Sequence, residues 1–266
     1  MSRDGRRRGL RVLGYVASVT VVLALWQYLS GRAIIPLLFP SPISTWKVGW
    51  GLAAKGQLGA DAWASLGRIL AGFALGSALG VAGGMFMGSF RPVRLFFEPY
   101  VQFLRFLPAL AWIPAVMLWL GTGERAKITL LAYTTVFIVA LNTMVGVTRV
   151  PRNQLRAARS FGASRWQIFR LVTIPATVGY MLTGMRLAMG NCFMTVVAAE
   201  LVASDTGLGY LIFSSRQWMQ TELAFVGIFV LGMMGLVADL IFRAATGRLL
   251  WRYESVGPFT SVRRKG

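Results

Sequence analysis

Six long runs of apolar residues constrain this chain more than any other feature of its sequence. A helix needs about 20 mostly apolar residues to cross the hydrocarbon core of a bilayer, and each run is near that length. Hydrophobic residues make up 56% of the chain and charged residues only 14%, which is typical of a membrane protein that crosses the bilayer several times. The sequence therefore predicts an all-α polytopic membrane protein with about six transmembrane helices. The predicted helices are residues 10–31, 69–90, 95–120, 128–147, 176–199 and 223–242.

Basic residues lie mainly on one side of these predicted helices. The net charge of +19 would also suit nucleic acid, but the basic residues follow alternate loops, and cytoplasmic loops of membrane proteins carry an excess of Lys and Arg. Both termini and the loop 149–175 are therefore predicted to be cytoplasmic, and no nucleic-acid partner is expected. The chain is predicted to be a single transmembrane domain, 1–266. It would have a cytoplasmic tail at 1–9, a six-helix membrane domain at 10–247 and a second cytoplasmic tail at 248–266.

The residue types that the sequence lacks exclude several kinds of chemistry. The chain has no histidine, which excludes Ser-His-Asp catalysis and histidine metal sites. It also has no Gly-x-x-x-x-Gly-Lys-Ser/Thr phosphate loop, so if ATP drives this protein, another chain must hydrolyse it. The single cysteine, Cys192, cannot form an intrachain disulfide. We therefore expect no enzymatic activity, no metal and no cofactor in this chain.

Two segments depart from simple membrane helices. Pro108 and Pro114 interrupt the third predicted helix, and prolines inside a membrane helix free backbone carbonyls and bend it. Before the second predicted helix, an amphipathic run carries Trp46, Trp50 and Trp63. Tryptophans favour the membrane–water interface, so this run is predicted to form a helix along the outer membrane face.

The predicted cytoplasmic loop between the fourth and fifth helices carries small residues at fixed spacing in a basic stretch. Paired alanines let a partner backbone approach closely, and glycine adopts the positive φ that a tight helix-to-helix corner needs. A proline in the first turn of the next helix costs no hydrogen bond. These residue types would suit a docking surface for a partner protein, and the alternative is a plain basic connector. In order, it consists of Arg156-Ala157-Ala158, three residues, Gly162, nine residues, and Val172-Thr173-Ile174-Pro175.

This loop resembles the coupling loop of permease subunits of binding-protein-dependent ABC importers. The family pattern is Glu-Ala-Ala, three residues, Gly, nine residues and Ile-x-Leu-Pro, and Ala157, Ala158, Gly162 and Pro175 match it. In that family the loop forms two short helices joined at the glycine, and the first helix docks on a separate ATP-hydrolysing subunit. The resemblance thus implies an ATPase-coupling site at these four residues and Arg156. Because Arg156 replaces the acidic residue of the pattern, the contact at this position cannot use a carboxylate.

Other segments resemble the nitrate, sulfonate and taurine branch of these importers. The resemblance implies a type I permease in the bacterial inner membrane, working as a homodimer with two ABC ATPase subunits, which use ATP and Mg²⁺, and an extracytoplasmic substrate-binding protein. It also implies a small anion or polar organic substrate, such as nitrate, a sulfonate, taurine or bicarbonate. The matching segments are Phe39-Pro40-Ser41-Pro42, the proline-containing run 103–121, and Ala198-Ala199-Glu200 followed by Gly207-Leu208-Gly209.

The alternative is a self-sufficient anion channel or a secondary transporter. Secondary transporters usually show internal repeats or broken helices in both halves, and the sequence contains no convincing repeat. A membrane-embedded enzyme would need a cluster of catalytic groups, which the few scattered acidic residues do not provide. Dependence on a partner ATPase separates the importer from these alternatives.

The second predicted helix carries a stripe of glycines at every fourth position. Such faces let helices pack backbone to backbone in lipid. The stripe is therefore predicted to be a helix-packing surface, either a static contact or one that slides or lines a pore when a transporter changes shape. Its members are Gly72, Gly76, Gly80, Gly84 and Gly88.

Charged residues inside the predicted helices need a partner or a role, since each costs about 2.5–3.5 kcal/mol on insertion scales. Two arginines facing a shared cavity would favour an anion, so Arg105, Arg186 and Glu200 are candidates for the translocation path. Alternatively, Arg105 pairs with Glu98 on its own helix. Arg186 would then pair with Glu200 or Asp239, and such pairs would only hold the bundle together.

Overall fold

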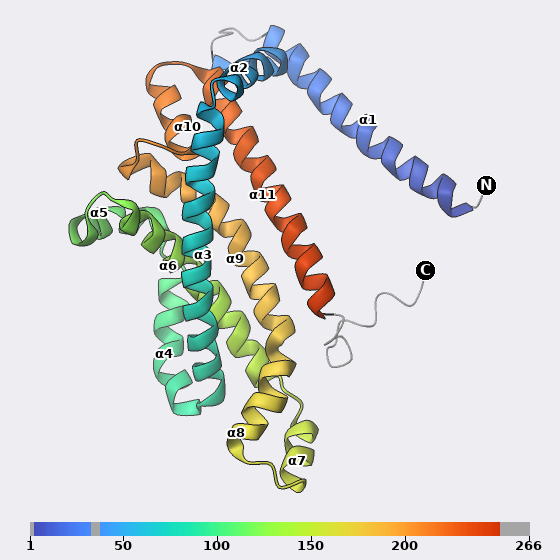
Figure 1. The fold of residues 1–266 in the computed structure, drawn as a ribbon, viewed down its shortest axis with the longest axis vertical. Helices are drawn as coiled ribbons and strands as arrows, with labels where there is room; N and C mark the ends of the chain where they lie inside the picture. Colours follow the sequence, from blue (N-terminus) through green and yellow to red (C-terminus); the bar gives the residue numbers. More distant parts are fainter. Residues whose placement is uncertain (1–2, 33–37, 251–266) are drawn as a thin grey trace.

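The structure is a computed structural model that describes residues 3–32 and 38–250, and its regular elements in these ranges are all helices (Figure 1). Five helices are long and apolar enough to cross a membrane, and a bent helix pair makes a sixth span if the pair counts as one. The predicted all-α polytopic fold is therefore confirmed. Of the predicted tails, residues 3–9 continue the first helix, and residues 251–266 lie outside the described part of the chain. The five single candidate spans are Leu13–Gly31, Gln57–Ser89, Glu124–Thr148, Arg165–Leu201 and Thr221–Gly247.

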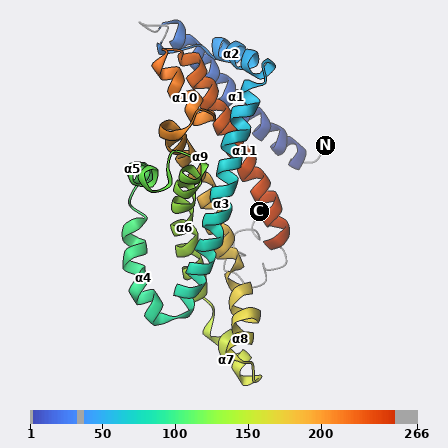
Figure 2. The same cartoon turned by 60° about the vertical axis from the view of Figure 1, so that its left-hand side comes forward.

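Three long helices form the centre of the bundle: α3 (Gln57–Ser89), α6 (Glu124–Thr148) and α9 (Ile174–Ala203) (Figures 1 and 2). Their shared apolar core includes Ile69 of α3 and Leu131 of α6, both fully buried. The sequence forms these helices because long apolar stretches have no water partners in lipid, so their backbone groups must bond within the helix.

The predicted glycine stripe of α3 packs directly against α6. A Cβ at any of the five glycines would lie within 3 Å of an atom of α6, so a side chain there would push the two helices apart. The facing residues also recur every fourth position, which lets the two backbones run in close contact along both helices. In this structure the stripe is a close-packed surface inside one chain. The facing pairs are Gly72 with Leu131, Gly76 with Thr135, Gly80 with Val139, Gly84 with Thr143 and Gly88 with Val147.

The third predicted helix is broken into α4 (Arg91–Leu104) and α5 (Ala109–Leu120), which meet at an angle of 101° (Figure 2). The break follows from Pro108, because proline has no amide hydrogen to donate to the carbonyl four residues earlier. That carbonyl, on Leu104, instead accepts hydrogen bonds from the Tyr133 hydroxyl of α6 at 2.7 Å and from the Leu107 amide at 3.1 Å. The second proline, Pro114, lies within α5 without ending it.

Shorter helices cover the end of the bundle where α3 begins. α2 (Pro42–Ala54) starts at Ser41, whose side chain accepts a hydrogen bond from the amide of Ser44 and caps the helix. Trp46 and Trp50 of α2 are 74% and 70% exposed, in keeping with the predicted interfacial helix. α10 (Leu208–Gln217) lies at the same end of the bundle (Figure 1).

Two long helices flank the bundle. α1 (Arg3–Gly31) meets α11 (Thr221–Leu250) near one end and diverges from it toward the N-terminus (Figure 1). The point of contact is Trp26, whose ring stacks on Phe225 and Phe229 of α11. The Trp26 indole also donates to the Pro40 carbonyl at 3.1 Å, which ties α1 to the start of α2.

Candidate functional site

The predicted coupling loop forms two short helices that project beyond the bundle, at the end opposite α2 (Figures 1 and 2). They are α7 (Arg152–Ser160) and α8 (Arg165–Ile168), and the π-helical turn η2 (Phe169–Thr173) leads on into α9. Gly162 joins α7 to α8 with φ of 74°, a left-handed conformation that favours glycine.

Residues next to Gly162 fix the direction of α8. The Ser164 side chain accepts a hydrogen bond from the Gln167 amide, and the Gln167 side chain accepts one from the Ser164 amide. This reciprocal arrangement is a capping box, which satisfies backbone donors at the start of a helix. Gly162 and the capping box thus give the sharp corner between the two short helices.

The loop exposes apolar side chains beside its small and basic residues. Phe161, at the corner, is 90% exposed, and Trp166 and Leu171 are also exposed. Exposed apolar residues rimmed by charge are typical of a protein interaction surface. Of the residues predicted for coupling, Arg156, Ala157 and Gly162 are exposed, Ala158 is half-buried, and Pro175 lies in the first turn of α9.

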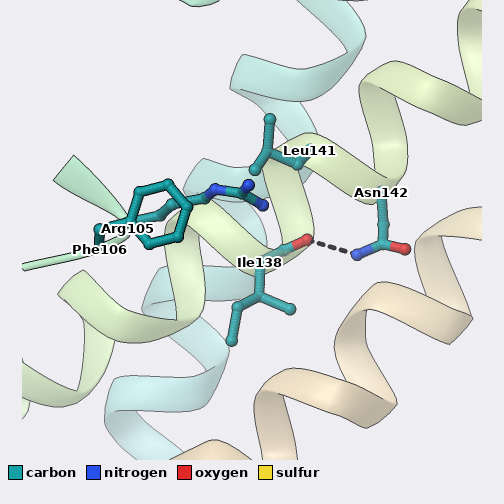
Figure 3. Close-up of a pocket in the computed structure, with 5 residues that line it drawn as sticks. All are labelled: Arg105, Phe106, Ile138, Leu141 and Asn142. Carbon is teal, nitrogen blue, oxygen red and sulfur yellow. Dashed lines mark hydrogen bonds between the residues drawn. The ribbon is translucent and has the colours of Figure 1, made fainter. Parts of the chain in front are cut away.

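Arg105 lies at the break between α4 and α5 and lines a pocket of about 330 Å³ (Figure 3). Phe106 lines the same pocket from the break, and α6 contributes Ile138, Leu141 and Asn142. The guanidinium carbon lies 4.7 Å from the centre of the Phe106 ring, within the range of a cation–π contact. Across residues 3–32 and 38–250, Arg105 forms no ion pair with a carboxylate, Glu98 included.

Arg186 pairs with Asp239, which was one of the partners predicted for it. The Arg186 Nε atom of α9 lies 2.7 Å from an Asp239 oxygen on α11. Arg243 binds the second oxygen of the same carboxylate, also at 2.7 Å. Arg186 does not line the Arg105 pocket.

Glu200 is fully buried and ends in a polar network at the α2 end of the bundle. Its carboxylate accepts hydrogen bonds from the Ser65 hydroxyl at 2.8 Å, the Arg68 guanidinium at 2.7 Å and the Gly209 amide at 2.8 Å. Glu200 lies 14 residues beyond Arg186 on the same helix, or about 21 Å at 1.5 Å per residue. The structure therefore does not gather Arg105, Arg186 and Glu200 around one cavity.

Arg68 is the centre of this network. Its guanidinium binds Glu124 through two hydrogen bonds of 2.7 and 2.8 Å and donates to the Thr206 carbonyl at 2.7 Å. Glu124 in turn binds Lys127 at 2.9 Å, and Asp61 accepts the Gly207 amide at 2.8 Å. The network ties the turn between α9 and α10 to α3 and α6.

The sequence analysis missed this network because Arg68 precedes the predicted start of the second span at residue 69. The signal that would have found it is spacing. Residues three or four apart share a helix face. The face of the glycine stripe continues toward the N-terminus, at intervals of four, three and four residues, through Arg68, Ser65 and Asp61. A polar extension of a packing face predicts buried polar partners.

A broken membrane helix, a close-packed core and a two-helix loop beyond the bundle define a polytopic membrane transport subunit. Comparison with known families makes this specific: the chain belongs to the family described as "Binding-protein-dependent transport system inner membrane component", whose model matches residues 72–250. It is thus an inner-membrane permease subunit of the ABC transporter type, as the loop resemblance predicted.

Named relatives and a solved structure agree with this assignment. The chain is 33% identical to the putative aliphatic sulfonates transport permease protein of Bacillus subtilis (strain 168), over 96% of this chain and 93% of the relative. It is also 33% identical to the taurine transport system permease protein of Escherichia coli (strain K12), over 90% of each chain. An inward-facing structure of the MetNI methionine ABC transporter shares the fold, with a TM-score of 0.58, 20% identity and coverage of 72% of this chain and 97% of that chain.

Proposed function

We propose that this chain is the permease of an ATP-driven importer for small organic sulfonates and related small anions. It receives its substrate from an extracytoplasmic binding protein and couples to a separate ATPase through residues 156–175. The relatives named for taurine and for aliphatic sulfonates, which match it over nearly their whole length, support this substrate class. Nitrate and bicarbonate share the small size and negative charge and belong to the same proposal.

The projecting loop is the observation that carries the coupling part of the proposal. It places Phe161, small residues and exposed arginines where a second protein can reach them. The sequence has no phosphate-binding loop of its own, so ATP and Mg²⁺ are used by the partner, and this chain conducts rather than catalyses. Arg156 is exposed on α7 and favours an acidic residue on the ATPase at that contact.

The remaining assembly is part of the same proposal. Two copies of this chain face each other around the path, each with its own coupling loop. The excess of arginines around α7 and α8 supports a cytoplasmic position for this end of the bundle, and the proposal assigns both termini to the same side. α2 and α10 then lie at the outer face, where the binding protein docks.

Co-purification with the ATPase, together with solute uptake, tests this function. The full chain is expressed with its ATPase and binding protein as wild type, Phe161→Ala, Gly162→Val and, as a control, Trp50→Ala. Trp50 is also a largely exposed aromatic residue, but it lies at the other end of the molecule. Because an aromatic anchor typically contributes about 2 kcal/mol to an interface, we expect both loop variants to retain at least about tenfold less ATPase than wild type.

Uptake of taurine and ethanesulfonate into proteoliposomes with ATP inside completes the test. We expect uptake by wild type and at least about tenfold less by the loop variants, while Trp50→Ala is the control for retention of the ATPase only. Full retention of the ATPase by both loop variants at equal permease yield would reject the coupling site. Uptake that continues without the ATPase would instead support the channel or secondary transporter, and ATP-dependent uptake of neither sulfonate would reject the substrate class.

A further inference from the structure

We infer that the pocket at the break between α4 and α5 is a substrate anion site within the membrane, with Arg105 and Asn142 as the groups that bind the anionic head. This inference rests on the proposed function and assigns the substrate contact to particular residues. The pocket combines an exposed charged side chain, an amide and an aromatic ring (Figure 3). Its volume of about 330 Å³ falls at the lower end of pockets that hold small molecules.

The pocket lies near the middle of the membrane-spanning helix α6. α6 runs over 25 residues, Glu124–Thr148, so its centre is residue 136. Ile138 and Asn142 lie two and six residues past that centre, or about 3 and 9 Å along the helix axis. The hydrocarbon core extends about 15 Å to either side of its midplane. Arg105, which lines the same pocket, therefore lies at a depth where lipid tails surround an unshielded side chain.

The lack of a carboxylate partner for Arg105 within the described residues also supports the inference. A charge at this depth is costly and normally pairs with another group or faces a water-filled cavity. Arg68 pairs with Glu124 and Glu200, and Arg186 pairs with Asp239. Arg105, by contrast, has no such ion pair within the described residues. Its guanidinium lies over the face of the Phe106 ring. Its positive charge therefore remains available to an anion that enters the path.

The chemistry around the guanidinium selects the kind of anion. A guanidinium presents its donors as a planar fork that matches two oxygens of a sulfonate or carboxylate. The Asn142 amide donates one hydrogen to the Ile138 carbonyl at 2.8 Å, and in the described part of the chain its second N–H and its oxygen have no other partner. The Phe106 ring, Ile138 and Leu141 provide apolar surface for a short carbon chain. A small organic anion with one charged head and a short tail fits this arrangement.

The break in the helix keeps this site in place. Pro108 ends the hydrogen-bond ladder of α4, and the Leu104 carbonyl accepts from the Tyr133 hydroxyl of α6 at 2.7 Å as well as from the Leu107 amide at 3.1 Å. Arg105 is the next residue along the chain, so the bond to Tyr133 anchors its backbone to the same helix that supplies Asn142. The contact beside Arg105 therefore holds the break against α6.

Cysteine labelling tests whether the pocket is open to water and attracts anions, without any need for the natural substrate. In the complete complex, Asn142→Cys is treated with thiosulfonate reagents that carry either a sulfonate or a quaternary ammonium group. For each reagent, the rate with Asn142→Cys is divided by its rate with a small free thiol. We expect this ratio to be about tenfold higher for the sulfonate reagent than for the ammonium reagent, because Arg105 attracts the sulfonate. In the double variant with Arg105→Gln, this preference should disappear. Val139→Cys is a matched control, since Val139 lies at similar depth but is fully buried, and native Cys192 is buried as well.

Transport by Arg105 variants tests the role of the site in import. With ethanesulfonate as the probe, Arg105→Gln should lower uptake at least about tenfold, the effect of removing one charge-assisted contact. Arg105→Lys should retain much of it. Saturating ethanesulfonate should slow labelling of the Asn142→Cys variant when Arg105 is present, whereas vesicles of anionic lipid without ethanesulfonate should not. Slowing by the anionic lipid alone would identify a lipid headgroup as the ligand and overturn the inference.

The outcomes separate this inference from the proposed function. If wild type imports the anions but the Asn142→Cys variant reacts with neither reagent, or shows no preference that depends on Arg105, the pocket is not an anion site and the importer function stands. Unchanged uptake by Arg105→Gln would likewise show that the pocket is not the substrate site, while the importer function stands. If wild type imports neither sulfonate while the charge preference is present, the pocket attracts anions and the proposed substrate class is wrong.

Discussion

At the scale of single residues, Glu200 is the side chain whose loss should harm the protein most. It is fully buried, and its carboxylate holds Arg68, Ser65 and the Gly209 amide. Without Glu200, Arg68 would lose its fully buried partner and keep only Glu124, which is half-exposed, and breaking a buried ion pair costs up to about 3–5 kcal/mol. We expect Glu200→Ala to lower the thermal unfolding temperature of the detergent-solubilised protein by many degrees, and Glu200→Gln to lower it less because its shape is retained.

A second glutamate provides the control for this prediction. Glu98 on α4 is half-buried and, within the described ranges, belongs to no ion pair. Glu98→Gln should therefore leave the unfolding temperature close to that of wild type. Equal unfolding temperatures for Glu200→Ala and Glu98→Gln would show that the network contributes nothing to stability.

The hydrogen bond at the helix break provides a smaller test at the same scale. Tyr133 donates its hydroxyl hydrogen to the Leu104 carbonyl that Pro108 leaves without its usual donor. Tyr133→Phe removes only the hydroxyl and should destabilise the protein by about 1 kcal/mol. The measurement is thermal unfolding in detergent, with Tyr15→Phe on the exposed face of α1 as the control. A Tyr133→Phe protein as stable as this control would mean that the Leu107 amide, which also donates to this carbonyl at 3.1 Å, is sufficient.

At the scale of helices, the contact between α3 and α6 depends on glycine. A Cβ at Gly80 would lie 2.8 Å from the Val136 carbonyl oxygen, a backbone atom that cannot move aside alone. Forcing extra atoms into a packed contact costs about 1–3 kcal/mol. Gly80→Ala should therefore lower the unfolding temperature, and Gly80→Leu should abolish accumulation of folded protein.

Gly83, on the same helix, is the matched control. A Cβ at Gly83 meets no atom within 4 Å, and alanine favours a helix over glycine. Gly83→Ala should match or exceed wild type in unfolding temperature. The packing assignment would fail if the alanine variants at positions 80 and 83 behaved alike.

The helices also show what the sequence could and could not predict. Hydropathy located the spans because apolar length is a local property, and Pro108 located the break because proline lacks a donor in any context. The start of α3 was placed at residue 69, yet the helix begins at Gln57. Its first turns carry Asp61 and Arg68, whose partners come from α6 and from the turn after α9. Hydropathy scores such polar side chains as solvent-exposed, since it contains no information about distant partners.

The candidate sites were also predictable where they depend on local sequence and not where they depend on contacts between distant residues. The α7–α8 corner was predictable, since Gly162 and its neighbours encode it locally. The pairing of Arg186 with Asp239 was only one of several options, because it joins α9 to α11 across 53 positions of sequence. The Arg105 pocket depends on how the break in one helix meets the middle of α6, which no local pattern specifies.

At the scale of the whole molecule, the two ends of the bundle should face opposite sides of the membrane. α2 and the α7–α8 loop lie at opposite ends (Figure 1), and the arginines of the loop favour the cytoplasmic side. Single cysteines at Trp50 and at Phe161, both largely exposed, report the two ends. In intact cells a membrane-impermeant thiol reagent should label Trp50→Cys at once. Phe161→Cys, expressed without the ATPase that would cover it, should react only after the inner membrane is permeabilised.

The labelling pattern also distinguishes the ways in which this orientation could be wrong. Native Cys192 is buried, so wild type provides the unlabelled background for both variants. Labelling of Phe161→Cys alone in intact cells would place the coupling loop outside, away from any ATP, and would contradict the importer. Labelling of both variants in intact cells would mean that the helices do not carry the loop across the bilayer. The importer requires that Trp50→Cys is accessible from outside and Phe161→Cys from inside. The binding protein and the ATPase can then bind opposite faces of one permease.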